Sequence, residues 1–197
     1  MNWGNTKTTY GWATIALHWI AAIGVVAMFT TGLLADMARE NGDRAARAAL
    51  MGLHISTGAT LFTFFAARIA LHYLQVQPVK APQARWMNTL ATVTQHLLLL
   101  GILIQIVSGP LAVWTGGRAI NVFDVVSLPS PFPSRVQSLH EIAEKAHLVG
   151  RATIFFLLPM HVLGAHKHLF VDRDGAFFRM LWPTPLTKTV QDAPPRP

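Results

Sequence analysis

The sequence of 197 residues contains no cysteine. This absence excludes disulfide bonds, thiolate metal sites, iron–sulfur clusters and the C-x-x-C-H motif that attaches a c-type haem covalently. Charge is also scarce: only 13% of the residues are charged, against about a quarter in a typical soluble domain. More than half of the chain, 52%, is hydrophobic, and the mean hydropathy is +0.37. The composition is therefore that of a membrane protein.

Four long apolar stretches predict four membrane-spanning helices, because about 20 mostly apolar residues are needed to cross a bilayer. The predicted helices cover residues 12–35, 46–74, 86–114 and 139–170. The first stretch is too long for a signal peptide and is interpreted as a retained span. We therefore expect an all-α, up-and-down four-helix bundle that forms one domain over residues 1–183. Residues 184–197 form a proline-rich tail that we expect to be disordered.

The net charge of +7 does not indicate a nucleic-acid partner, because the Lys and Arg residues are scattered at the ends of the spans. Positive residues in membrane proteins favour the cytoplasmic side. With the amino terminus inside, nine fall on that side: Lys7, Arg68, Lys80, Arg85, Lys167, Arg173, Arg179, Lys188 and Arg196. Six fall on the other: Arg39, Arg44, Arg47, Arg118, Arg135 and Lys145. This distribution predicts that both termini are cytoplasmic.

Histidine is the informative residue of the spans. His18, His54 and His96 are each the only ionisable residue in the apolar core of one of the first three spans, and the fourth span contains His147 and His161. A polar residue inside a bilayer is unfavourable unless it has a function or a partner. Neutral histidine is the commonest metal ligand and a usual axial ligand of haem iron. Because cysteine is absent, any haem would be held noncovalently.

His147 and His161 are 14 residues apart, which is about 1400° of helical rotation and a rise of about 21 Å. They therefore lie on one face of the fourth helix at two depths, which suits two stacked haems. His18 lies near the cytoplasmic start of the first span, level with His161. His54 lies near the outer start of the second span, level with His147. Topology and rise thus predict the pairs His18/His161 and His54/His147.

Other interpretations of the histidines remain open. His54 and His72 are 18 residues apart and share a helix face, so they could instead be the partners of His147 and His161. This pairing has a rise of about 27 Å against 21 Å and leaves His18 unexplained. A histidine in a membrane helix can also be a hydrogen-bonded core or interface residue. The interfacial interpretation is the one that we prefer for the remaining members of the set: His72, His96, His140, His166 and His168.

The carboxylates all lie outside the apolar cores, so no proton relay through the membrane is evident, and electron movement is favoured over ion pumping. They are Asp36, Glu40, Asp43, Asp124, Glu141, Glu144, Asp172, Asp174 and Asp192. Arg68 and Arg151 lie within or at the edge of spans. Haem propionates would be suitable partners for both guanidinium groups, and the alternative is that both reach the lipid headgroups.

The sequence resembles the bacterial cytochrome b561 family from Tyr10 to Pro183. The resemblance rests on Ala16-Leu17-His18-Trp19, Gly52-Leu53-His54 with Gly58, Arg68, Gln95-His96-Leu97-Leu98, Ser108-Gly109, His161, His168, Asp172-Arg173-Asp174-Gly175 and Arg179-Met180-Leu181. It implies four helices, two b haems and electron exchange with a membrane quinone of the ubiquinone type. The ligand positions of the family match His18, His54 and His161. The fourth ligand is either His140, which precedes Glu141 as is common in the family, or His147, which the 14-residue spacing favours.

The sequence therefore predicts a multi-pass electron-transfer protein of the bacterial inner membrane, holding two haems and passing electrons across the bilayer to or from quinone. His168 and Arg68 are expected near the quinone. Some members of the family oxidise superoxide at the periplasmic face, so a superoxide:quinone oxidoreductase is one expectation, and Arg118 and Arg135 could attract the anion. One alternative is a haem-bearing anchor subunit for a dehydrogenase or a periplasmic redox protein. Another is a haem-free transporter of metal ions or small solutes. The donor, the direction of electron flow and the oligomeric state stay open.

Overall fold

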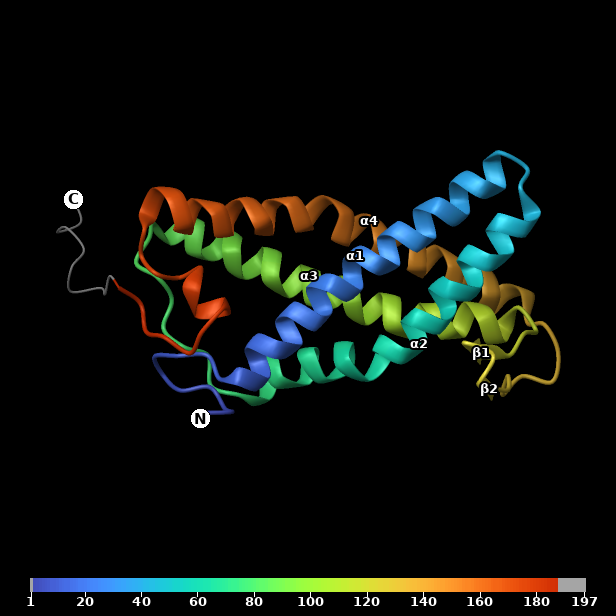
Figure 1. Ribbon diagram of the computed structural model, residues 1–197, viewed down its shortest axis with the longest axis horizontal. Coiled ribbons are helices and arrows are strands. Elements are labelled where there is room, and N and C mark those ends of the chain that lie inside the picture. Colours follow the sequence, from blue (N-terminus) through green and yellow to red (C-terminus); the bar gives the residue numbers. More distant parts are fainter. Residues whose placement is uncertain (1, 188–197) are drawn as a thin grey trace. The chain divides into compact units, whose positions relative to one another are not determined.

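The computed structural model describes residues 2–187 and contains four long helices (Figure 1). They are α1 (Trp12–Glu40), α2 (Arg44–Leu74), α3 (Arg85–Thr115) and α4 (Gln137–His166). Each is long and apolar enough to cross a membrane. A helix satisfies its own backbone hydrogen bonds, which a lipid environment requires of any spanning segment. The predicted all-α fold with four membrane helices is therefore confirmed.

The helix ends differ from the predicted ones by a few residues. α1 continues to Glu40 instead of ending near residue 35, and α4 begins at Gln137 instead of 139. After His166 the chain continues as a π-helical turn, η1 (Lys167–Asp172), and later forms a 3₁₀ helix, η2 (Phe178–Met180). Residues 188–197 of the predicted tail lie outside the described residues. The division of the chain into one domain and a tail stays a prediction.

The chain packs as two compact units, and every long helix contributes a segment to each. The second unit comprises Ile20–Ala66 and Ile102–Arg151. Besides helical segments it contains a hairpin of two short antiparallel strands, β1 (Ile120–Val122) and β2 (Val126–Leu128), drawn in yellow in Figure 1. Ser56 of α2 fastens this hairpin, because its hydroxyl bonds to Asn121 and Phe123.

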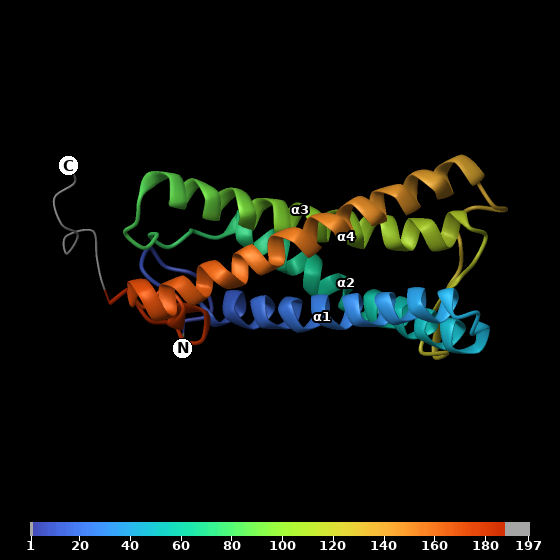
Figure 2. The ribbon, with the colours of Figure 1, turned by 90° about the horizontal axis from the view of Figure 1, so that it is seen from above.

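The first unit comprises Met1–Trp19, Ala67–Gly101 and Ala152–Pro197. Its amino-terminal and carboxy-terminal segments run close to the start of α1, as the blue and red segments in Figure 2 show. Arg179 ties them together: its guanidinium donates to the carbonyl oxygens of Thr8 (2.9 Å) and Val79 (2.8 Å). Trp19 adds a bond from its indole nitrogen to the carbonyl of Met180, at 2.6 Å.

Candidate haem sites

In the first unit, His18 of α1 and His161 of α4 face each other with ring centroids 6.1 Å apart. Both rings are half-buried. Among the described residues neither imidazole forms a hydrogen bond, although Trp19 packs edge-on against His18 at 5.4 Å. Arg68 of α2 is close enough to act electrostatically on both rings. The first unit therefore contains a pair of imidazoles whose nitrogens have no hydrogen-bond partner among residues 2–187.

In the second unit, His54 of α2 and His147 of α4 form a similar pair with centroids 6.3 Å apart. Their Nδ1 atoms have hydroxyl partners. Thr31 Oγ1 of α1 lies 3.1 Å from His54 Nδ1, and Ser108 Oγ of α3 lies 3.1 Å from His147 Nδ1. A hydroxyl that holds Nδ1 fixes the plane of the ring and makes Nε2 the ligand atom. Nε2 of His147 also lies 3.5 Å from Nε2 of Gln105, a long contact that a bound metal ion would replace.

Glycines make room for these two rings. A Cβ atom at Gly32 would lie 3.4 Å from the His54 ring, and a Cβ atom at Gly109 would lie 3.6 Å from the His147 ring. Each imidazole thus packs against the bare backbone of a neighbouring helix, α1 for His54 and α3 for His147. Any side chain larger than alanine at either glycine would have to occupy space that the ring now uses.

The spacing of both pairs fits the binding of one metal ion from two sides. Bonds from imidazole nitrogen to a metal are about 2.0 Å long, so two opposed ligand nitrogens are about 4 Å apart. The ring centres lie about 1 Å behind these atoms, which gives about 6 Å between centroids. The observed 6.1 and 6.3 Å agree with this value. The residues present therefore fit an iron atom held between each pair.

The rival pairing is not the one that the structure brings together. His72 packs against Tyr73 at 5.0 Å and against His96 at 5.2 Å. His96 also places its Nδ1 2.8 Å from the carbonyl oxygen of Thr92, on its own helix. A centroid distance of 5.2 Å is about 1 Å too short for two rings on opposite sides of one metal ion. His72 and His96 therefore form an edge-to-face contact in the first unit, with Tyr73 as its third member.

His140, the other candidate on α4, has protein partners for both nitrogens. Its Nδ1 lies 2.9 Å from the carbonyl oxygen of Ala112, and its Nε2 lies 3.3 Å from Glu144. The ring also packs closely on Gly116, where a Cβ atom would lie 3.3 Å away. In this arrangement His140 connects the start of α4 to the end of α3 and is not paired with His54.

We therefore expect His140→Ala to leave the haem content unchanged. The substitution removes a side chain that bonds the Ala112 carbonyl, so the free energy of unfolding should fall by about 1 kcal/mol. Haem quantification and thermal unfolding of the purified protein measure the two effects. Loss of a haem in His140→Ala, together with full occupancy in His147→Ala, would reassign this ligand.

Of the three remaining site candidates, Arg151 and His168 each form an ion pair. In the second unit, Arg151 of α4 contacts Asp36 of α1 at 2.8 Å, and both residues act electrostatically on His54. In the first unit, His168 of η1 places Nδ1 2.7 Å from the buried carboxylate of Asp174, and Lys167 pairs with Asp172. Arg68 forms no ion pair with a carboxylate among residues 2–187.

Sequence reasoning identified the four paired histidines but missed the hydroxyl groups of Thr31 and Ser108. Ser108 belongs to the Ser108-Gly109 motif that contributes to the family resemblance, but the resemblance assigns no role to it. Thr31 has no sequence signal beyond its position next to Gly32, because small polar residues are common in membrane helices. A hydroxyl becomes recognisable as a partner only when the rotation of one helix against the next is known.

These features define a class of protein: a membrane cytochrome that holds haem between helices without covalent attachment. A family model described as prokaryotic cytochrome b561 matches residues 9–183. The chain belongs to this family. It is also 30% identical over 185 residues to cytochrome b561 homolog 2 of Escherichia coli (strain K12), covering 92% of this chain and 95% of the relative.

Membership of the family establishes the coarse function. The protein is a multi-pass protein of the bacterial inner membrane, its helices contact lipid, and it binds haem b and transfers electrons. The predicted family, location and general class of function are therefore confirmed.

Proposed function

We propose that the chain holds two haem b groups, one between His18 and His161 and the other between His54 and His147, and passes electrons across the membrane to or from a quinone. The observation that carries this proposal is the presence of two imidazole pairs, each about 6 Å between centroids and each in a different unit. The 14 residues between His147 and His161 correspond to a rise of about 21 Å along one helix, from which we propose that one pair serves each face of the membrane.

A bound haem supplies a one-electron change of its iron between the ferrous and ferric states. The chain's own residues set the conditions for that change. The four imidazoles act as neutral ligands, and the Thr31 and Ser108 hydroxyls orient two of them. Ligands held in this way need little rearrangement when the charge of the iron changes, since their partners are already in place.

The two arginines of the spans are proposed partners of haem propionates. Arg68 supports this role best, because it is half-buried, acts on His18 and His161, and has no carboxylate partner among the described residues. A propionate would supply the missing negative charge by a bidentate contact. Arg151 is already paired with Asp36. A propionate at this position would therefore contact a guanidinium whose charge is partly neutralised.

We place the quinone near the His18/His161 pair, at the face where the larger number of Lys and Arg residues predicts the cytoplasm. Quinone reduction and quinol oxidation exchange protons as well as electrons. His168 is seven residues beyond His161, two helical turns or about 10 Å by rise. Its Nδ1 is held by Asp174, which leaves Nε2 available for proton exchange. His168 and Arg68 are therefore the residues that we assign to this region.

At the other face, the exposed Arg118 and Arg135 favour a small anionic electron donor, and superoxide has that chemistry. A soluble redox protein or a membrane dehydrogenase would make the chain an anchor subunit instead. Co-purification of a stoichiometric redox subunit, with no transfer from superoxide to quinone by the isolated chain, would favour the anchor function.

The proposal is tested with purified protein in liposomes that enclose ferricyanide. Quinol added to the membrane should reduce the haems, and the enclosed ferricyanide should then be reduced at a rate that depends on the protein. His54→Ala removes a proposed ligand of the second unit, whereas the proposed quinone region belongs to the first unit. This variant should therefore abolish transfer but leave one quinol-reducible haem. If dithionite reduces the haems and quinol does not, the quinone part of the proposal is wrong.

We expect the hydroxyl partners to affect haem retention. Ser108→Ala and Thr31→Val remove the groups that hold His147 and His54, and loss of such partners typically weakens metal binding by about 10- to 100-fold. Haem titration of the apoprotein measures the change. Thr60→Val is the matched control, because within the described part of the chain the Thr60 hydroxyl donates only to the carbonyl oxygen of Ser56 on its own helix, at 2.9 Å. Equal affinity in Ser108→Ala and Thr60→Val would show that the Ser108 hydroxyl has no such role.

A further inference from the structure

The tip of the β1–β2 hairpin exposes a cluster of apolar side chains. Phe123, Val125 and Val126 are 54%, 83% and 51% exposed. Residues 123–125 form the three-residue turn between the strands, a place where polar side chains are usual. Contiguous apolar side chains on a loop tip indicate contact with another apolar phase or molecule.

The tip is held in a fixed and unfavourable conformation. Phe123 and Asp124 have φ angles of 49° and 57°, in the left-handed region that residues with side chains rarely adopt. Ser56 of α2, which is buried, stabilises this turn: its hydroxyl donates to Asn121 O (3.1 Å) and accepts from Phe123 N (2.9 Å). A strained turn persists only where the surrounding structure holds it in place. Here the spanning helix α2 holds the turn and so fixes the position of the apolar tip.

The contact with Ser56 places the tip at membrane depth. Ser56 lies twelve residues inside α2, about 18 Å from the start of the helix by rise. α2 has 31 residues, so a centred helix would extend only about 8 Å beyond each side of a 30 Å hydrocarbon core. Trp114, at the end of α3, also bonds through its indole nitrogen to Leu128 O of β2, at 3.3 Å. Tryptophan is enriched at the membrane interface. The contact with Trp114, like the contact with Ser56, therefore places the hairpin at the level of the membrane.

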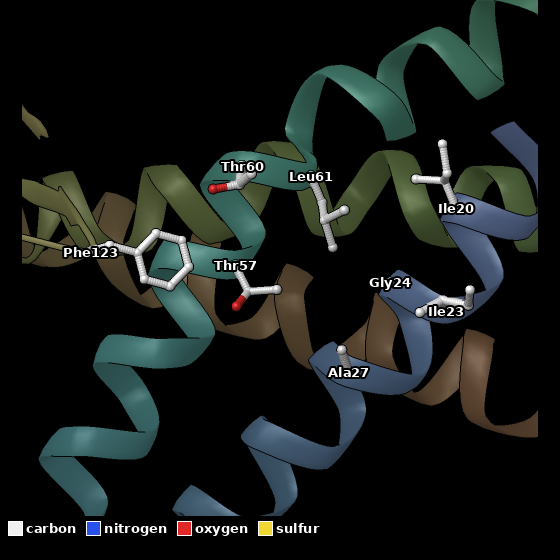
Figure 3. Close-up of a pocket in the computed structure, with 8 residues that line it drawn as sticks. All are labelled: Ile20, Ile23, Gly24, Ala27, Thr57, Thr60, Leu61 and Phe123. Carbon is white, nitrogen blue, oxygen red and sulfur yellow. The ribbon is translucent and has the colours of Figure 1, made fainter. Parts of the chain in front are cut away.

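The tip continues a surface of the spanning helices. Phe123 lines a groove of about 350 Å³ together with residues of α1 and α2 (Figure 3). The other lining residues are Ile20, Ile23, Gly24, Ala27, Thr57, Thr60 and Leu61. The groove lies within the two spans, where lipid chains are the surrounding phase. The strands meanwhile pair with each other from Ile120↔Leu128 to Val122↔Val126, which limits the number of unpaired backbone groups that would face lipid.

We propose that the hairpin tip, Phe123 to Val126, is a lipid-binding element that lies in the leaflet entered by the end of α1, with an acyl chain against Phe123 and the adjoining groove. Asp124 sets its depth. A carboxylate is strongly unfavourable at the centre of a bilayer but tolerated near the headgroups. In a centred α2, Ser56 would lie about 10 Å inside the hydrocarbon core. The unfavourable burial of Asp124 shifts the tip from that level toward the headgroups, so the tip lies between the two. This inference is independent of the electron-transfer proposal.

The sequence contains no cysteine, so a single introduced cysteine can be labelled selectively. Val125→Cys and, separately, Val126→Cys are labelled with a nitroxide in the haem-replete protein, which is then placed in lipid nanodiscs. We expect collisions with oxygen, which concentrates in the acyl region, to exceed collisions with a water-soluble nickel chelate by a few-fold. Arg118→Cys, an exposed position just before β1, is the matched control and should show the reverse order.

If the labels at 125 and 126 collide more often with the nickel chelate than with oxygen, as the control does, the tip projects into water and the proposal is overturned. In that case a soluble protein partner would be the better explanation of the apolar cluster. Using two neighbouring positions protects the result from a local effect of one label. The absorbance of the haem at each variant verifies that the labelled chain has kept its fold.

Discussion

Replacing either His18 or His161 with alanine is expected to remove the same haem and to leave the other in place. The two rings lie 6.1 Å apart on α1 and α4 within the first unit, whereas His54 and His147 belong to the second unit. Loss of one axial imidazole leaves iron with an incomplete ligand set. We therefore expect haem content to fall from about two to about one per chain in each single variant.

The double variants make this prediction sharper. Ligands of one iron act as a unit, so His18→Ala combined with His161→Ala should lose no more haem than either single change. His18→Ala combined with His54→Ala should lose both haems. Haem extraction and redox titration provide the count and show which redox transition has disappeared. His72→Ala is the control, because His72 lies in the same unit but contacts His96 and Tyr73.

Two results would contradict this assignment. If His18→Ala and His54→Ala removed the same redox transition, the pairs would be crossed. If His72→Ala removed a haem and His18→Ala did not, the rival pairing would be correct. The haem that remains in each single variant also acts as an internal test of folding, since it requires intact helices around it.

The helices and the paired histidines could be predicted from sequence because both depend on position along one regular element. An apolar stretch of sufficient length is helical in lipid. The separation of His147 and His161 then fixes their depth and their common face. Pairing with His18 and His54 needs only the direction in which each span runs. These arguments require no knowledge of how one helix is rotated against another.

The features that sequence reasoning missed depend on that rotation or on contacts between distant segments. The Thr31 and Ser108 hydroxyls reach His54 and His147 across helix interfaces. The hairpin strands have three residues each, too few for an alternating pattern to be recognised. Both strands are also stabilised from outside, through Ser56 and Trp114.

Arg179 shows the same limitation at the carboxy-terminal end. In the sequence it stands out only as part of the family resemblance and as one of the nine positive charges assigned to the cytoplasmic side. In the structure it is 3% exposed and lies over the Tyr10 ring, 5.1 Å from the centroid. Burial lowers the pKa of this guanidinium, while Tyr10 and Asp174 oppose that shift. The partners come from residues 8, 10 and 79, which no local pattern connects to residue 179.

Arg179→Ala is expected to destabilise the first unit by about 3 kcal/mol, because it leaves the Thr8 and Val79 carbonyl oxygens without their donor. It also removes the cation–π contact with Tyr10 and the positive charge that acts on the buried Asp174. For a chain of this size the melting temperature should fall by about 10 °C. Thermal unfolding, followed by circular dichroism in detergent and in nanodiscs, measures the effect.

Two further variants separate the causes. Arg85→Ala removes an exposed arginine of the same unit and should change the free energy of unfolding by less than about 0.5 kcal/mol. Arg179→Lys keeps the charge but cannot donate two bonds in the fixed geometry of a guanidinium, so its stability should fall between those of the wild type and Arg179→Ala. A melting temperature for Arg179→Ala equal to that of Arg85→Ala would show that the terminal segments are held together by other contacts. Of those, the bond from Trp19 to Met180 O would be the first to test, since Trp19 is also the neighbour of His18.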